Sequence, residues 1–91
     1  MPPEIVKKKA YYPQFADIWS LGVLLYIMLY GNFPFRSNYE NDLYDKIEKG
    51  VFQTSDIISN QGNNLIKKIL KVNPLDRPSA NSILLDEWFN N

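Results

Sequence analysis

The feature that most constrains this sequence is a stretch of uncharged, mostly bulky residues from 18 to 30, which Asp17 precedes. Its apolar side chains would lie on nearly every side of a helix, whereas a surface helix shows a single apolar stripe. Gly31 and Pro34 then interrupt the pattern. We therefore predict a central, buried helix over about residues 15–30 that needs cover on every side.

The same stretch must be weighed as a membrane span. A bilayer needs about 20 predominantly apolar residues, and the continuous apolar run ends at Tyr30. We therefore favour a core helix and expect no membrane partner. The N-terminus does not resemble a signal peptide, because prolines and Glu4 follow Met1 directly.

Composition narrows the possible functions. Ninety-one residues make at most one small domain. Ten acidic and ten basic residues cancel, which argues against nucleic acid as the main partner. The sequence has no cysteine and no histidine, so disulfides and zinc sites of the Cys/His kind are excluded.

Further helices are predicted on both sides of the central one. The first nine residues can form a short helical turn, with Pro3 at its start. Residues 38–49 form a helix that Gly50 ends. Its predicted inner face consists of Tyr39, Leu43 and Ile47, which lie four residues apart. Asp42 and Lys46, and likewise Asp45 and Lys49, are spaced four residues apart, as ion pairs along a helix require.

Two serines mark the starts of the remaining helices. Ser59 caps a helix that runs to about Val72, and Ser79 caps a last helix. Their predicted buried residues are Leu65, Ile66, Ile69 and Leu70 in the first, and Ile83, Leu84, Trp88 and Phe89 in the second. No segment alternates as a strand would, so the predicted class is all-α.

Four motifs, in order across nearly all of the chain, resemble the protein kinase family. Pro3-Glu4 resembles the end of the Ala-Pro-Glu motif that closes the activation segment. Asp17-Ile-Trp-Ser-Leu-Gly22 resembles the Asp-x-Trp-Ser-x-Gly signature of the αF helix. Gly31-Asn-Phe-Pro-Phe35 is similar to the turn after αF, and Arg77-Pro-Ser79 with Trp88-Phe89 is similar to the end of the C-lobe.

The resemblance implies that residues 1–91 are a partial kinase domain, the lower half of a C-lobe. Ser20 and the Pro34-Phe35 pair resemble the serine/threonine branch, and residues 33–52 are similar to calmodulin-dependent-kinase-like members. The intact family transfers the γ-phosphoryl group of ATP to protein hydroxyls. An unrelated helical bundle that mimics these spacings is the competing interpretation.

The resemblance also implies structural roles for individual residues. Glu4 and Arg77 would form a buried ion pair; the alternative is two unrelated surface charges. Asp17 would hold the backbone of the catalytic loop, or simply cap its helix. These three residues are expected to be structural and not catalytic, as are Trp19, Gly22, Leu24 and Met28.

Four more positions on the central helix are singled out. Leu24 and Met28 match anchors of the apolar stack that rises toward the adenine pocket, although generic core is the alternative. Trp19 and Gly22 resemble packing positions, and a mid-helix glycine suggests close approach of another element. Two positions differ from the family pattern. Ile27 occupies the position at which some members carry a glutamate, and Asp86 occupies a position at which a histidine is common.

The residues that carry phosphoryl transfer in the family are absent. Catalysis needs a phosphate-covering loop, a lysine, Mg²⁺ ligands and a catalytic aspartate. The sequence has no Gly-x-Gly, no His-Arg-Asp and no Asp-Phe-Gly. We therefore expect no catalytic, cofactor-binding or metal-binding residue in this chain and no activity alone; ATP and Mg²⁺ belong to the intact domain.

The expected partners are the remainder of the kinase domain and, beyond it, a protein substrate or regulator. The missing part of the domain would cover one side of the central helix, so we expect the isolated chain to expose an apolar patch there. An alternative function is a non-catalytic protein-binding module, a decoy or scaffold that uses the αF–αG surface. The expected location is intracellular, in the cytoplasm. A methionine is common just before Ala-Pro-Glu within the family, so Met1 can correspond to an internal residue of a kinase domain. Three interpretations of the chain stay open: a truncated gene model, a pseudogene product and a true short protein.

Overall fold

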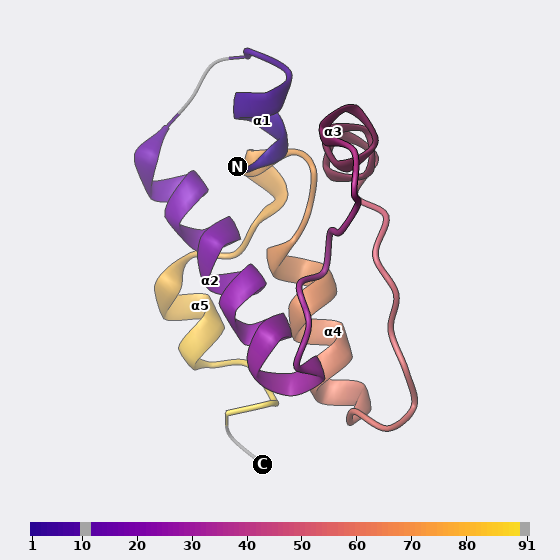
Figure 1. Ribbon diagram of the computed structural model, residues 1–91. Coiled ribbons are helices and arrows are strands. Elements are labelled where there is room, and N and C mark those ends of the chain that lie inside the picture. Colours follow the sequence, from indigo (N-terminus) through magenta and orange to yellow (C-terminus); the bar gives the residue numbers. More distant parts are fainter. Residues whose placement is uncertain (10–11, 90–91) are drawn as a thin grey trace.

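The computed structural model describes residues 1–9 and 12–89, which form helices joined by extended connectors (Figure 1). The elements in chain order are α1 (Pro3–Val6), α2 (Pro13–Tyr30), α3 (Glu40–Lys49), α4 (Asn60–Ile69), the 3-10 helix η1 (Pro74–Asp76) and α5 (Ala80–Leu84). No strand occurs in these ranges, so the predicted all-α class is confirmed.

Helix α2 is longer than the sequence pattern predicted. It begins at Pro13, which the prediction left in a loop, because a proline suits the first helical position. It ends at Gly31, whose φ of +74° is the left-handed conformation that a glycine adopts without strain. The resulting helix has 18 residues.

Burial of α2 is one-sided. One face is buried, through Ala16, Trp19, Gly22, Leu25 and Tyr26. On another face, Leu21, Leu24 and Met28 are 42%, 52% and 71% exposed. The molecule is only 16 Å thick along its shortest axis, and one helix with its side chains is already about 10–12 Å wide. The described residues therefore cover α2 on one face, and its other face is the exposed apolar patch expected of the isolated chain.

Length and composition alone would allow α2 to cross a membrane, and it is the one such helix in the part of the chain that the structure describes. This is weak evidence, because the core helix of a soluble protein passes the same test.

The core lies where α4 runs beside α2 (Figure 1). Leu65, Ile66, Ile69 and Leu70 are all buried, as predicted. The Ser59 side chain accepts a hydrogen bond from the Gly62 N–H at 3.1 Å, which confirms the predicted cap.

Helix α3 packs beside α1, away from the C-terminal end of α2 (Figure 1). Its two predicted ion pairs form, Lys46 with Asp42 at 3.4 Å and Lys49 with Asp45 at 3.0 Å. Ile47 is buried, but Tyr39 is 76% exposed. Tyr39 precedes the helix as its N-cap residue, so the helical spacing that put it on the inner face does not apply.

The last helix is shorter than predicted. The Ser79 side chain accepts the Ser82 N–H at 3.1 Å, so the predicted cap is confirmed, and Ile83 is buried. Leu84 and Phe89, however, are exposed, and Trp88 is half-buried. The prediction for Phe89 is wrong because the helix ends at Leu84 and its periodicity does not continue. The prediction for Leu84 is wrong because Leu84 directly follows the buried Ile83, and neighbouring helical positions do not face the same side.

Candidate functional site

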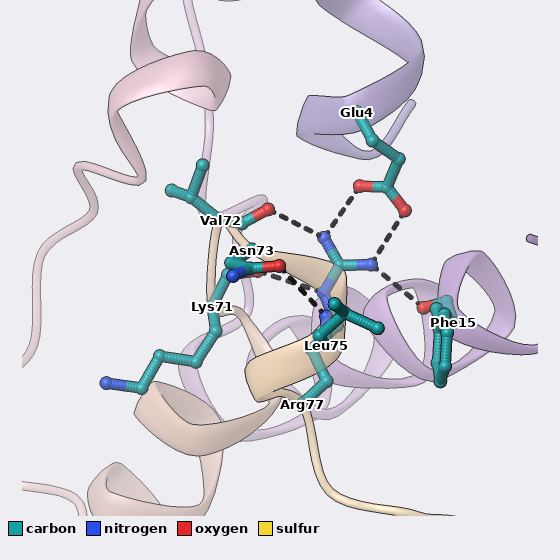
Figure 2. A network of polar contacts seen from close by, with 7 residues as sticks. All are labelled: Glu4, Phe15, Lys71, Val72, Asn73, Leu75 and Arg77. Carbon is teal, nitrogen blue, oxygen red and sulfur yellow. Dashed lines mark hydrogen bonds and ion pairs between the residues drawn. The ribbon is translucent and has the colours of Figure 1, made fainter. Parts of the chain in front are cut away.

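The side chains of Glu4 and Arg77 form a bidentate ion pair (Figure 2). Arg77 Nη1 donates to Glu4 Oε2 at 2.9 Å, and Nη2 donates to Glu4 Oε1 at 2.8 Å. The two residues are 3% and 6% exposed. A planar guanidinium is suited to this geometry, because its parallel N–H groups match the two carboxylate oxygens.

The remaining N–H groups of Arg77 donate to backbone carbonyls. Nη1 also donates to Phe15 O at 2.9 Å, Nε to Lys71 O at 2.9 Å, and Nη2 to Val72 O at 3.4 Å. All five guanidinium donors are thereby used. Arg77 thus connects α1, the first turn of α2 and the residues that follow α4, in an arrangement that we call the clasp (Figure 2).

The clasp changes the acidity of Glu4. Burial acts to raise the pKa of its carboxyl, but the hydrogen bonds from Arg77, a backbone hydrogen bond and the charge of Arg77 outweigh it. The pKa of Glu4 therefore lies below its ordinary value of 4.5. The carboxylate is ionised at neutral pH, as an ion pair with Arg77 requires.

A second feature is one exposed stripe along α2, which we call the α2 stripe and which comprises Asp17, Leu21, Leu24 and Met28. Their spacing of four, three and four residues keeps them on one side of the helix. Asp17 lies in the fifth position of α2 and Tyr12 is the N-cap residue, so the cap interpretation of Asp17 is wrong. The generic-core alternative for Leu24 and Met28 is also wrong, because both are exposed.

Trp19 and Gly22 lie on the buried side of α2, away from the stripe. The Trp19 ring stacks on Phe35, with ring centroids 5.8 Å apart. At Gly22, an added Cβ would lie 2.9 Å from Leu70 Cδ2 and closer still to Ile69. Gly22 is thus the point where α4 approaches α2.

Asp86 forms hydrogen bonds of its own. Its carboxylate accepts from the Trp88 backbone N–H at 3.0 Å and pairs with Lys68 at 2.9 Å. The Trp88 N–H and the Lys68 ammonium together lower the pKa of Asp86. The end of the chain is thereby attached to α4.

The sequence prediction missed a group of polar residues that holds the connector between α3 and α4. Tyr26 Oη donates to Gln53 O at 2.7 Å. The Ser55 N–H donates to Tyr30 Oη at 2.9 Å, and Tyr30 Oη in turn donates to the Asn63 side chain. The sequence shows that Tyr26 and Tyr30 are spaced to lie on the same side of a helix. This spacing alone does not reveal which groups their hydroxyls bind.

The acidic side chains of the described residues lie apart from one another. Over residues 1–9 and 12–89, no three His, Cys, Asp or Glu side chains are placed to hold a metal ion. The acidic groups that are positioned most firmly, Glu4 and Asp86, are bound to basic side chains.

Comparison with known proteins identifies the family. The family model described as "Protein kinase domain" matches residues 1–89. The chain is 39% identical to the "Carbon catabolite-derepressing protein kinase" of Candida tropicalis, over 96% of this chain and 14% of that protein. It is 41% identical to "CBL-interacting protein kinase 17" of Oryza sativa subsp. japonica, over 96% of this chain and 19% of that protein.

A solved structure is similar as well. The twitchin kinase region from C. elegans superposes with a TM-score of 0.88 and 28% identity, over 97% of this chain and 16% of that one. The chain thus spans less than a fifth of the length of these relatives. It belongs to the protein kinase family and corresponds to part of a serine/threonine kinase domain.

Proposed function

We propose that the chain forms the lower half of the C-lobe of a serine/threonine kinase, from the end of the activation segment to the last helix. In this proposal α2 is the αF helix of the family. The intact domain transfers the γ-phosphoryl group of ATP to serine or threonine hydroxyls of proteins, and this chain alone has no such activity. The proposed location is intracellular.

The observation that carries this proposal is the α2 stripe. It combines a carboxylate, Asp17, with the exposed apolar side chains of Leu21, Leu24 and Met28 along a single helix. An exposed apolar surface of this kind marks a contact with another element. In the proposal, the rest of the kinase domain covers it: Asp17 accepts hydrogen bonds from the catalytic-loop backbone, and Leu24 and Met28 support the apolar stack below the adenine pocket.

The clasp has a separate role in the proposal. It attaches α1, the end of the activation segment, to α2 and to the end of α4 through one buried guanidinium. The position of the segment that receives substrate would then depend on Arg77. The residues that bind ATP and Mg²⁺ belong to the remainder of the domain.

A chimera tests the proposal. The matching segment of the Saccharomyces cerevisiae "Carbon catabolite-derepressing protein kinase", 39% identical over 87 residues, is replaced by this chain, and phosphoryl transfer to a peptide is measured with Mg²⁺ and ATP. We expect activity in the chimera and none in the 91-residue chain. Leu24→Asp should abolish activity in the chimera, while Ser20→Ala, at an exposed position on the same helix, should leave it largely intact. Activity of the isolated chain, or a folded but inactive chimera, would contradict the proposal.

A second candidate function is protein binding without catalysis, as a decoy or scaffold, through the surface between α2 and α3. The specific observation in its favour is a hollow of about 510 Å³ at that surface, lined by residues from α2, α3 and both adjoining connectors. Recovery of a specific partner by the chain, lost when residues of this hollow are changed, would support it.

A further inference from the structure

The hollow between α2 and α3 is an open groove. It lies between residues 33–38, which follow α2, and residues 51–53, which follow α3. Tyr26 is its most buried lining residue and meets Phe52 edge to face, with ring centroids 5.9 Å apart. Phe33 and Val51 are 61% and 59% exposed. A groove with this much exposed lining suits an extended chain segment better than an enclosed small molecule.

Hydrogen bonds hold both sides of the groove. Tyr26 Oη on α2 donates to Gln53 O at 2.7 Å, which holds the connector after α3. Lys46 Nζ on α3 donates to Arg36 O at 2.8 Å, which holds the connector after α2. Because these segments are already ordered, a ligand would not bear the entropic cost of ordering them.

The charge of the groove is one-sided. Arg36 and Lys46 line it, and none of its lining residues is acidic. Asp42 pairs with Lys46 at 3.4 Å, which compensates one of the two cations. Arg36 is exposed and has no ion pair with any residue in the described ranges. The guanidinium of Arg36 is therefore available for a carboxylate, which it can hold bidentately.

We propose that this groove binds an extended segment of a partner protein in which an acidic side chain lies next to an apolar one. The carboxylate pairs with Arg36, and the apolar side chain covers Phe33 and Val51. This inference rests on the second candidate function above and adds the chemistry of the partner. Nucleic acid is a weaker match, because two cations neutralise few phosphates and the chain has no net charge.

Peptide titration tests the proposal. Fluorescein-labelled peptides with a neutral polar background carry a central Glu-Leu, Lys-Leu or Glu-Ser pair, and fluorescence anisotropy reports their binding to the full chain. We expect the Glu-Leu peptide to bind about 5- to 10-fold more tightly than either of the others. Raising the salt concentration should weaken it, and amide shifts in ¹⁵N NMR spectra should concentrate at residues 33–38 and 51–53.

A charge reversal supplies the decisive comparison. Arg36→Glu should weaken binding of the Glu-Leu peptide about 5- to 10-fold and strengthen binding of the Lys-Leu peptide. Lys8→Glu makes the same change of charge at an exposed lysine outside the groove and should change neither. Circular dichroism of each variant separates loss of binding from loss of fold, and the same titrations on the chimera cover the case of a poorly ordered isolated chain.

Three results would overturn the proposal: equal binding of the Glu-Leu and Lys-Leu peptides, no effect of Arg36→Glu, or equally tight binding of a single-stranded oligonucleotide of the same length. The last would indicate a general polyanion surface. Failure here is distinct from failure of the C-lobe assignment, because phosphoryl transfer by the chimera is measured without the peptides. A chimera that transfers phosphoryl groups but binds none of the peptides would contradict the groove proposal and leave the C-lobe assignment intact.

Discussion

Arg77 and Glu4 are separated by 73 positions in the sequence, and the guanidinium of one holds both carboxylate oxygens of the other in a site that solvent barely reaches. The other N–H groups of Arg77 donate to the carbonyls of Phe15, Lys71 and Val72. A single side chain thereby satisfies backbone acceptors from two further parts of the chain. Arg77 thus joins α1, the first turn of α2 and the segment that follows α4.

Removing either partner of the clasp should destabilise the protein strongly. Glu4→Gln leaves a buried guanidinium without its counter-charge, and Arg77→Gln leaves a buried carboxylate without its own. Loss of one partner of a buried pair typically costs about 3–5 kcal/mol. We expect either variant of the isolated chain to lose most of its helical circular-dichroism signal at 25 °C. Lys7→Gln, an exposed change near Glu4, is the control and should leave the signal unchanged.

The clasp also predicts how stability depends on acid. The pKa of Glu4 is lower in the folded chain than its ordinary value of 4.5, so the folded state binds fewer protons than the unfolded state. The stability that Glu4 contributes is therefore complete above pH 4.5 and is lost as the pH falls through the lower, folded pKa. Urea titrations from pH 6 to pH 2.5 should show this decline.

Two variants assign the acid-dependent decline to particular residues. Asp86 also has a lowered pKa, through the Trp88 N–H and Lys68, so Asp86→Asn should remove part of the decline and Glu4→Gln another part. Because the isolated Glu4→Gln chain is expected to be unfolded, both variants are measured in the chimera. An unchanged slope in Glu4→Gln would show that the clasp does not titrate as described.

Local signals in the sequence predicted the helices and their caps well. Ser59 and Ser79 cap helices as expected, and Gly50 ends α3 with a φ of +66°. These features depend on neighbouring residues, which the sequence displays directly. The clasp was expected only through the family resemblance, because a charge pattern alone does not reveal a partner 73 positions away.

Burial was harder to predict than helix position. The uniform apolar character of α2 indicated cover on every side, but the other elements of this chain cover only one face. Sequence pattern reports which side chains avoid water, and it does not report whether the covering element belongs to the same chain. The tyrosine contacts to Gln53, Ser55 and Asn63 were missed for a related reason, since two of them involve backbone groups, which every residue has.

Gly22→Ala should destabilise the protein although alanine favours helix. The gain in helix propensity is about 1 kcal/mol. Against it, the new Cβ would lie 2.9 Å from Leu70 Cδ2 and closer to Ile69, and overpacking a tight contact typically costs about 1–3 kcal/mol. Ser20→Ala on the exposed side of α2 brings a propensity gain without the clash. The midpoint of chemical denaturation should therefore fall for Gly22→Ala and rise for Ser20→Ala. A higher midpoint for Gly22→Ala would contradict the close approach of α4.

The α2 stripe should make the isolated chain prone to association. We expect the wild-type chain to bind a hydrophobic dye, to self-associate in light scattering, and to unfold without a sharp transition. Leu24→Asp with Met28→Lys should reduce dye binding and association without loss of helix, because both residues are exposed. Leu25→Asp, one position away but 8% exposed, should unfold the chain. A sharply unfolding, monodisperse wild-type monomer would argue against an uncovered stripe.

Tyr30→Phe should loosen the connector between α3 and α4. The change removes one hydroxyl that accepts from the Ser55 N–H and donates to Asn63, and it leaves the ring, which stacks on Tyr26 with centroids 4.4 Å apart. A buried donor or acceptor left unsatisfied costs about 1–3 kcal/mol. Hydrogen exchange at the Ser55 and Asn63 amides should therefore accelerate, whereas Tyr39→Phe, at a tyrosine that is 76% exposed, should leave both rates unchanged. Equal exchange in the two variants would mean that the Tyr30 hydroxyl does not hold the connector.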